Sequence, residues 1–313
     1  MNIIDKILTS QFFTQQPPVL IDIGASGEIN QKWKKIAPYS ICIAFDADER
    51  EFNVTEQINK TFKKLITVNR IVTASKESEI DFYLTSWPYC SSLLKPETDK
   101  LEPWIFSKLF NVEKVTKLPG ITLDEALNQA GINYIDWFKT DTQGTDLRLF
   151  MSLKEPLRRN VLAAEFEPGI IDAYKGEDKL YKVMETLSQV GFWLSAMVVK
   201  GTQRLNADYK KKYGEFNSRH MLRESPCWAE LTYLRNPELQ NERAYLLLYV
   251  FALLETQFGF ALEVAEVASK NYSSPLWQEC KTTALKKINN EKRKVPLVVL
   301  KKQFNKFFSN IHD

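Results

Sequence analysis

Short apolar runs alternate with longer amphipathic segments through the middle of the chain. Most of the runs are apolar almost throughout, and glycine, polar or charged residues bound them. Continuous runs of this kind are typical of parallel strands that helices cover on both faces. We therefore predict a doubly wound α/β domain over residues 18–235. Its predicted strands are residues 19–24, 41–46, 65–72, 134–141, 161–166 and 191–199.

The segments between the runs carry helix signals. Thr122 is a candidate N-cap with Glu125 three residues on, and Gly131 is placed to end the helix that follows. Residues 177–190 are amphipathic and predict a second helix. The alternation breaks between the third and fourth runs, where residues 79–85 read as an inserted strand.

Helical segments flank the predicted domain. Residues 1–17 have apolar positions at helical spacing, which predicts a short leader, and Asp5 and Lys6 interrupt any signal-peptide core. Residues 236–313 predict a helical, basic C-terminal extension. Its apolar stretch at 244–254 is too short for a bilayer, which takes about 20 residues, and is expected to be a buried helix.

Charge is placed unevenly along the chain. The formal net charge of +3 gives no reason to expect nucleic-acid binding. Residues 281–313 contribute +7, however, and the rest of the chain −4. Apolar residues recur at helical spacing over 297–311, interleaved with lysines. We expect this tail to pack on the body or to form a homodimer, and peripheral contact with an anionic membrane is the alternative.

Histidine and cysteine are too sparse for several kinds of site. The two histidines, His220 and His312, are far apart and cannot form a multi-histidine zinc site. No cysteine pair has metal or redox spacing, so we expect reduced thiols and a cytoplasmic protein. The acidic residues lack the close spacing of a calcium or magnesium loop, so no metal is predicted. The cysteines are Cys42, Cys90, Cys227 and Cys280.

The ends of the predicted strands carry the candidate chemistry, because ligands of such sheets bind beyond the carboxyl ends of the strands. The first strand ends in a glycine turn, and the second ends in an acid that can accept hydrogen bonds from both ribose hydroxyls. A helix from about residue 28 would direct its amide groups at the same space. The predicted cofactor-binding residues are Asp22, Gly24, Ala25, Ser26, Gly27, Asp46, Ala47, Ser75 and Gln143.

This turn fits two cofactors unequally. A nicotinamide dinucleotide is bound by G-x-G-x-x-G, but the third glycine is missing here, and Glu28 would repel a pyrophosphate. S-adenosylmethionine has no phosphate and carries positive charge. A rim that includes Asp22, Asp46 and Asp141 therefore suits S-adenosylmethionine better.

Three segments resemble the FkbM-type methyltransferases. They are Ile21-Asp22-Ile23-Gly24-Ala25-Ser26-Gly27, then Ala44-Phe45-Asp46, then the run from Asp136 to Asp146, in which Asp146 stands for the usual glutamate. Ser91-Ser92-Leu93 is similar to the family's serine-rich insert. The resemblance covers roughly residues 18–200. It implies a class I, Rossmann-like fold and S-adenosylmethionine-dependent methylation of a hydroxyl on a sugar, glycan or natural product.

A base that accepts the hydroxyl proton is expected at the ends of the fourth and fifth strands. Asp141 ends the fourth, and Lys139 precedes it by two residues, so both point to one face. Glu165 and Glu167 end the fifth strand in the same alternating sense. We predict that Asp141 borders the substrate hydroxyl, with Glu167, Glu165 or Lys139 assisting.

Simpler interpretations stay open. Asp22 could cap a helix, Asp46 could be a solvated strand end, and Lys139 could pair with Glu165. His220 reads as a loop residue, and Gln143-Gly144 could be a plain turn. At the level of function, the alternatives are a nicotinamide-dependent oxidoreductase and a non-catalytic Rossmann-like scaffold.

Overall fold

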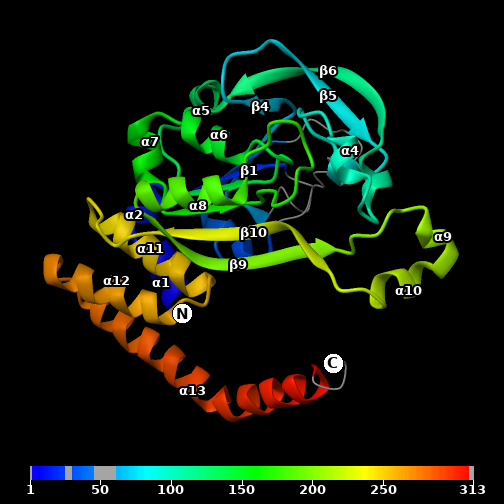
Figure 1. The fold of residues 1–313 in the computed structure, drawn as a ribbon. Coiled ribbons are helices and arrows are strands. Elements are labelled where there is room, and N and C mark those ends of the chain that lie inside the picture. Colours follow the sequence, from blue (N-terminus) through cyan, green and yellow to red (C-terminus); the bar gives the residue numbers. More distant parts are fainter. Residues whose placement is uncertain (1, 25–29, 46–60, 310–313) are drawn as a thin grey trace. The chain divides into compact units, whose positions relative to one another are not determined.

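The computed structural model describes residues 2–24, 30–45 and 61–309, and the chain folds into two compact units (Figure 1). Gln11–Asn236 form one unit, and Met1–Ser10 with Pro237–Asp313 form the other. The predicted leader therefore contributes a helix to each: α1 (Ile3–Leu8) belongs to the helical unit and α2 (Gln11–Gln15) to the sheet unit.

A seven-stranded, mostly parallel sheet organises the larger unit, which is a Rossmann-like α/β domain. The strand order is β3-β2-β1-β7-β8-β10-β9. The first five strands run parallel, and β10 is antiparallel to both of its neighbours. The strands are β1 (Val19–Ile23), β2 (Ile41–Phe45), β3 (Lys64–Val68), β7 (Trp137–Thr140), β8 (Ala163–Phe166), β9 (Phe192–Thr202) and β10 (Ser225–Arg235).

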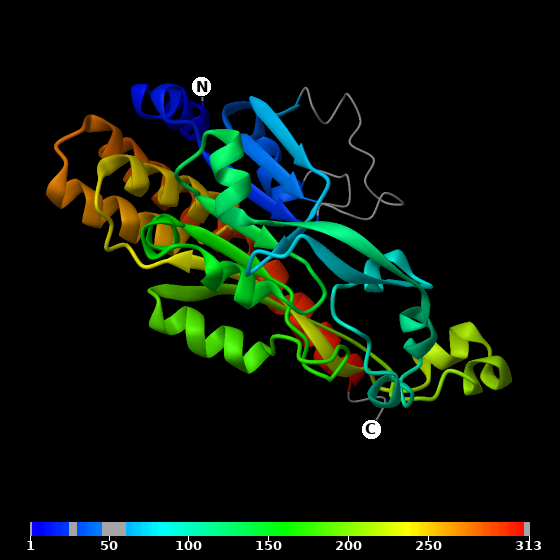
Figure 2. The ribbon, with the colours of Figure 1, turned by 90° about the horizontal axis from the view of Figure 1, so that it is seen from above.

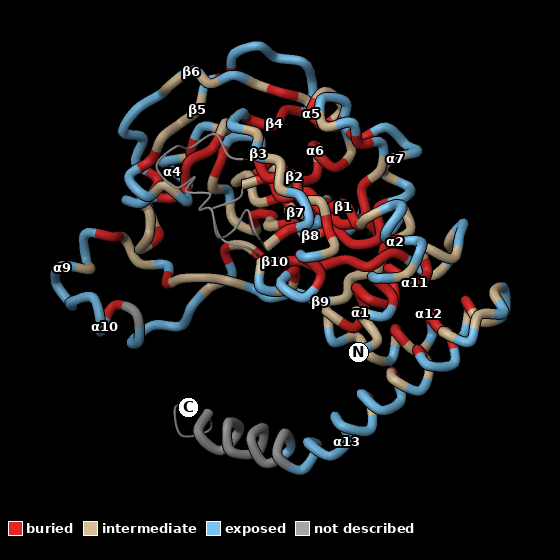
Figure 3. Tube along the Cα trace, turned by 180° about the vertical axis from the view of Figure 1, so that it is seen from behind, coloured by how far each residue is buried: buried red, intermediate tan, exposed pale blue. Residues whose placement is uncertain are grey.

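Both faces of the central strands are covered, as the continuous apolar runs predict. Successive residues of β7 point to opposite faces. On one face, Phe138 meets Phe150 of α6 (Asp146–Ser152) with ring centroids 5.3 Å apart. On the other face, Trp137 meets Trp33 of the 3-10 helix η1 (Gln31–Lys35) at 6.0 Å. All four rings are fully buried, and burial of each stabilises the fold by about 2 kcal/mol. Figure 3 shows the buried central strands.

The predicted third strand is wrong as a single element. Its residues are divided between β3 and β4 (Ile71–Thr73), which belongs to a second sheet of order β4-β6-β5. The inserted strand is confirmed as β5 (Glu79–Thr85), and it pairs antiparallel with β6 (Val112–Thr122), which was not predicted. The exposed, charged residues of β6 lack the apolar run by which the other strands were identified.

Strand β10 was also missed, although its sequence carries a signal. Cys227, Ala229, Leu231 and Tyr233 alternate with more polar residues, and all four are buried. This period of two is typical of an antiparallel strand with one buried face. The strand was not predicted because it is not apolar throughout.

The helix predicted after Thr122 is confirmed as α5 (Leu123–Ala130). Its capping box is complete: the Thr122 hydroxyl accepts from the Glu125 amide, and the Glu125 side chain accepts from the Thr122 amide. Gly131 ends the helix in the left-handed conformation at φ 69°. The helix predicted over 177–190 begins later, at Leu180, as α8 (Leu180–Gln189), and the preceding residues form hydrogen bonds in a loop.

Thr122→Ala is expected to lower the free energy of unfolding by about 1 kcal/mol, because it removes the N-cap acceptor. Urea unfolding measures this change. Thr98→Ala is the matched control: Thr98 is exposed at the start of α4 (Thr98–Leu101) and makes no capping bond within the described residues. Equal effects of the two substitutions would contradict a stabilising role for the capping box.

Short helices complete the sheet unit, and three longer ones form the rest of the helical unit. In the sheet unit they are η2 (Ala37–Tyr39), η3 (Pro88–Cys90), η4 (Ser107–Phe110), α7 (Glu155–Asn160), α9 (Tyr209–Tyr213) and α10 (Glu215–His220). In the helical unit they are α11 (Glu242–Leu254), α12 (Phe258–Asn271) and α13 (Pro275–Ser309).

Helix α11 is the buried core helix that the apolar stretch predicts, with Tyr245 through Leu253 all buried. The Tyr249 hydroxyl donates to the Cys280 carbonyl, and Trp277 Nε1 donates to Glu242, which ties α13 to α11. Among the described residues, no helix is both long enough and apolar enough to cross a bilayer. The predicted tail covers residues 297–311. Of its apolar side chains, the structure describes the burial of Val299 alone.

Candidate functional site

The candidate site lies where the strand order reverses, at the carboxyl ends of β1 and β7. These strands are neighbours in the sheet although β2 to β6 come between them in the chain. Gly24 follows β1 with φ 79°, and a Cβ on it would stand 2.1 Å from the carbonyl oxygen of Asp141. Because both the backbone angle and the close approach exclude a side chain, Gly24 is required where the two strand ends meet.

Polar residues cross the sheet in a row just before the strand ends. Asp22 of β1 lies opposite Lys139 of β7, which lies opposite Glu165 of β8, and Thr232 of β10 follows. Lys32 of η1 covers the far end of this row, with Nζ 3.1 Å from Glu165 Oε2 and 2.9 Å from Thr232 Oγ1. Side chains two residues further along share the same face, which places Asp141 and Glu167 in the next row.

The pairing within this row decides between the simpler interpretations. The Asp22 side chain is buried and accepts from Lys139 Nζ at 2.6 Å, so it does not act as a helix cap. Glu165 binds Lys32 and accepts from Trp137 Nε1 at 2.8 Å. The suggested Lys139–Glu165 pair is therefore wrong, because each residue has a closer partner on another element.

Lys139 is held in its charged form. Burial opposes the charge, but the Asp22 carboxylate and its hydrogen bond outweigh burial and raise the pKa of Lys139 above its ordinary value. An ammonium held in this way donates hydrogen bonds and does not accept protons near neutral pH. Of the roles predicted for Lys139, the geometry favours support of nearby carboxylates over that of a base.

Asp141 stands at the end of β7 with a perturbed carboxyl group. Its amide donates to the Ile23 carbonyl at 2.9 Å, which fixes it beside the end of β1. Burial, with a further contribution from the charge of Asp146, raises the pKa of Asp141 to about 6. Lys139 and the hydrogen bond from Gln143 partly offset this rise. An acid with a pKa near 6 is ionised at neutral pH and accepts a proton more readily than an ordinary carboxylate.

Gln143 connects Asp141 to Tyr174. Its Nε2 donates to Asp141 Oδ1 at 2.7 Å, and its Oε1 lies 3.2 Å from the hydroxyl of Tyr174. That hydroxyl also donates to the Cys90 carbonyl at 2.8 Å. Gln143 has φ 57°, an uncommon conformation for a residue other than glycine. The turn thus directs the Gln143 side chain at Asp141, so it does more than reverse the direction of the chain.

Glu167 contributes a second acid next to Asp141. Its side chain is half-buried, and within the described residues its carboxyl group has no hydrogen-bond partner. Burial and then the charges of Asp141 and Glu230 raise the pKa of Glu167 to about 9. At neutral pH the two neighbouring acids are therefore in different states, with Glu167 protonated and Asp141 ionised. Environments that separate two pKa values in this way are typical of acid–base sites.

Asp146 connects the ends of β7 and β8 through hydrogen bonds. It is buried and accepts from the Thr142 amide at 2.9 Å, from the Thr142 hydroxyl at 2.6 Å and from the Thr140 hydroxyl at 3.1 Å. Its second oxygen accepts from the Glu167 amide at 2.9 Å. One side chain thus links the loop after β7 to the residue that follows β8.

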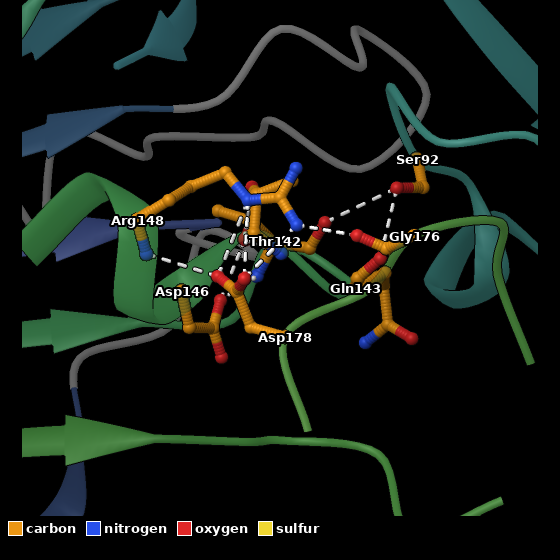
Figure 4. Close-up of polar contacts among 8 residues, drawn as sticks. Ser92, Thr142, Gln143, Asp146, Arg148, Gly176 and Asp178 are labelled. Atoms are coloured by element: carbon orange, nitrogen blue, oxygen red, sulfur yellow. Dashed lines mark hydrogen bonds and ion pairs between the residues drawn. The ribbon is translucent and has the colours of Figure 1, made fainter. Parts of the chain in front are cut away.

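Residues outside the sheet complete the surroundings of this loop (Figure 4). The Ser92 hydroxyl lies 2.9 Å from the Gln143 carbonyl, and Arg148 on α6 pairs with Asp178 at 2.9 Å. Ser92 is in the serine-rich insert that the resemblance singled out. Tyr174 and Asp178 were not predicted as site residues. Tyr174 lies in an irregular segment, and Asp178 was assigned to a helix that begins only at Leu180.

Several predicted site residues cannot be placed. Ala25, Ser26, Gly27, Asp46 and Ala47 all lie outside the described residues, as does the predicted helix start near residue 28. The described chain resumes with the short 3-10 helix η1.

Two further candidates are described but stand apart from this cluster. Ser75 is exposed, and its hydroxyl donates to Glu77 at 3.1 Å. His220 is exposed at the end of α10, with its ring 4.6 Å from that of Phe216. Within the described residues, neither contacts Asp141 or Glu167. In the parts of the chain that are described, no group of three or more His, Cys, Asp or Glu residues is arranged to hold a metal ion.

Comparison with known proteins finds no matching family model, no matching curated protein and no matching solved structure. The resemblance to the FkbM-type methyltransferases therefore rests on the motif residues alone.

Proposed function

We propose that this protein is an S-adenosylmethionine-dependent methyltransferase that methylates a hydroxyl group on a sugar, glycan or natural product. The observation that carries the proposal is the pair of half-buried acids, Asp141 and Glu167, at the point where the strand order reverses. Their pKa values are raised to about 6 and about 9. Such a pair at the usual ligand position of an α/β sheet is a candidate acid–base site.

The charges around this position suit a cationic cofactor. Asp141 is ionised at neutral pH, and the nearby Lys139 ammonium is already engaged by Asp22, so a negative charge is left at the end of β7. Carboxylates attract the sulfonium and ammonium groups of S-adenosylmethionine and repel the phosphates of a dinucleotide. Gly24 keeps the strand end free of a side chain. The described residues therefore fit S-adenosylmethionine.

The strand order also weighs against the nicotinamide alternative. Dinucleotide-binding domains typically have six parallel strands in the order 3-2-1-4-5-6. Here the reversed strand β10 stands between β8 and β9. The observed sheet therefore departs from the dinucleotide-binding arrangement, which favours the methyltransferase proposal over the oxidoreductase alternative.

Bound S-adenosylmethionine supplies the electrophilic methyl group. Ionised Asp141 accepts the proton of the substrate hydroxyl, which makes the oxygen a better nucleophile. Protonated Glu167 donates a hydrogen bond to the substrate and holds it in position. Gln143 orients the Asp141 carboxylate through the hydrogen bond to Oδ1. Lys139 and Asp22 neutralise each other's charge in the row of residues that precedes Asp141.

Calorimetric titration of the full-length protein with S-adenosylhomocysteine, S-adenosylmethionine and NAD tests the cofactor. We expect both adenosyl compounds to bind with micromolar dissociation constants and NAD to show no binding, because its phosphates meet carboxylates. Binding of NAD alone would favour the oxidoreductase. Binding of none of the three would favour the non-catalytic scaffold and overturn the proposal.

A further inference from the structure

Strands β9 and β10 form a long hairpin with two short helices at its far end. The hairpin tip, defined here as residues 209–223, contains α9 and α10. In Figures 1 and 2 the tip lies at the end of the hairpin, beyond the other strands of the sheet. Figure 3 shows that most of its backbone belongs to exposed residues.

Large apolar side chains are concentrated on the hairpin tip. Phe216 is 75% exposed and Tyr209 is 51% exposed, and Tyr213, Met221 and Leu222 are exposed as well. Single exposed apolar residues are common on proteins, but a group of them within one short segment marks an interaction surface. The tip therefore presents apolar surface that the folding of the sheet unit does not use.

The same segment is strongly basic. It contains Lys210, Lys211, Lys212, Arg219 and Arg223 against the single acid Glu215, a net charge of +4. Lys210 pairs with Glu215 at 3.0 Å. Lys211 and Lys212 are exposed, and Lys212 Nζ lies 5.3 Å from the centre of the Tyr213 ring. Positive charge and apolar side chains thus alternate within one short exposed segment.

Contacts with residues 104–108, which lie between β5 and β6, hold the base of the tip in place. Asp208 pairs with Lys108 of η4 at 2.5 Å, and the Ile105 amide donates to the Gln203 carbonyl at 3.3 Å. Arg204 lies over the ring of Trp104 at 5.7 Å. Because these contacts precede α9 directly, the sheet unit presents the tip in a defined position.

We propose that the hairpin tip docks on the surface of an anionic phospholipid bilayer. Basic side chains gain energy near negatively charged headgroups, and aromatic rings favour the boundary between headgroups and acyl chains. A segment that combines both, with low overall hydrophobicity, lies in the membrane surface without crossing it. A nucleic acid would engage the lysines and stack on Phe216, but it offers no apolar layer for Met221 and Leu222.

Co-sedimentation of the full-length protein with vesicles tests this proposal. One set of vesicles is phosphatidylcholine alone, and the other is phosphatidylcholine mixed with phosphatidylglycerol. We expect binding to the mixed vesicles that weakens as salt is added, and little binding to the neutral ones. No binding to the mixed vesicles would overturn the proposal.

Two variants distinguish the tip from the C-terminal extension, which is also basic. Lys211→Gln with Lys212→Gln is expected to weaken vesicle binding about thirtyfold, and Phe216→Ser about tenfold or more. The matched controls are Lys63→Gln with Lys64→Gln, two exposed lysines at the start of β3, and Tyr181→Ser on α8, where Tyr181 is 73% exposed. Controls that bind as the wild type does support the tip. Equal loss in controls and tip variants, or wild-type binding by the tip variants, contradicts it.

Discussion

Asp141→Asn is expected to lower the rate of methyl transfer about 10²–10⁴-fold, the usual contribution of a general base. The amide keeps an oxygen to accept the hydrogen bond from Gln143 Nε2, so the local geometry is retained while the basic site is lost. The measurement is transfer of a radiolabelled methyl group to the hydroxyl acceptor that the wild-type protein methylates fastest in a panel of sugars, glycans and natural products. A wild-type rate in the variant would exclude Asp141 as the base.

The stability of this variant separates a catalytic effect from a structural one. The fold raises the pKa of Asp141 from 3.8 to about 6, so ionisation of Asp141 costs the folded state stability as the pH rises through that interval. A neutral Asn avoids this cost, and the thermal midpoint at neutral pH is expected to be no lower than that of the wild type. Asp99→Asn, at an exposed position on α4, is the control for loss of a charge. A large fall in the thermal midpoint of Asp141→Asn would assign the lost rate to unfolding.

The pH dependence of the wild-type rate follows from the same two acids. The rate is expected to rise as Asp141 ionises near pH 6 and to fall as Glu167 loses its proton near pH 9. The two groups interact, so the limbs of the profile report the pair as a whole.

Asp146→Ala is expected to lower the free energy of unfolding by about 4 kcal/mol, because it removes a buried acceptor of four hydrogen bonds. The part-buried amides of Thr142 and Glu167 are among the donors that lose their partner. Asp146→Asn is expected to have a smaller effect of about 2 kcal/mol, since an amide keeps one acceptor oxygen in nearly the same shape. Urea unfolding at neutral pH measures both.

Asp81→Ala on β5 is the matched control, because Asp81 is exposed and its removal is expected to change stability by less than about 0.5 kcal/mol. If Asp146→Ala were no more destabilising than Asp81→Ala, Asp146 would not be the residue that holds the strand ends. A binding measurement adds a second check: Asp146→Asn should weaken S-adenosylhomocysteine binding if the loop after β7 shapes the cofactor site.

The sequence predicted those parts of the fold that depend on residues close together in the chain. Thr122, Glu125 and Gly131 fix both ends of α5 through contacts a few residues apart, and the structure has each of them in place. The buried central strands were predicted for a similar reason, because burial on both faces demands an apolar run. Strand β6 escaped prediction because its partners are far away in the chain and its own residues are mostly exposed.

The sequence by itself determined that Asp22, Lys139, Asp141 and Glu167 stand at or near strand ends, since the alternation of apolar and polar residues sets which positions end a strand and which share a face. Only the tertiary structure decided how they pair. Lys139 is bound by Asp22 across the sheet and Glu165 by Lys32 from η1, whereas Glu167 is left beside Asp141 with its pKa raised. These contacts join residues more than a hundred positions apart, or depend on burial, and neither is a property of local sequence.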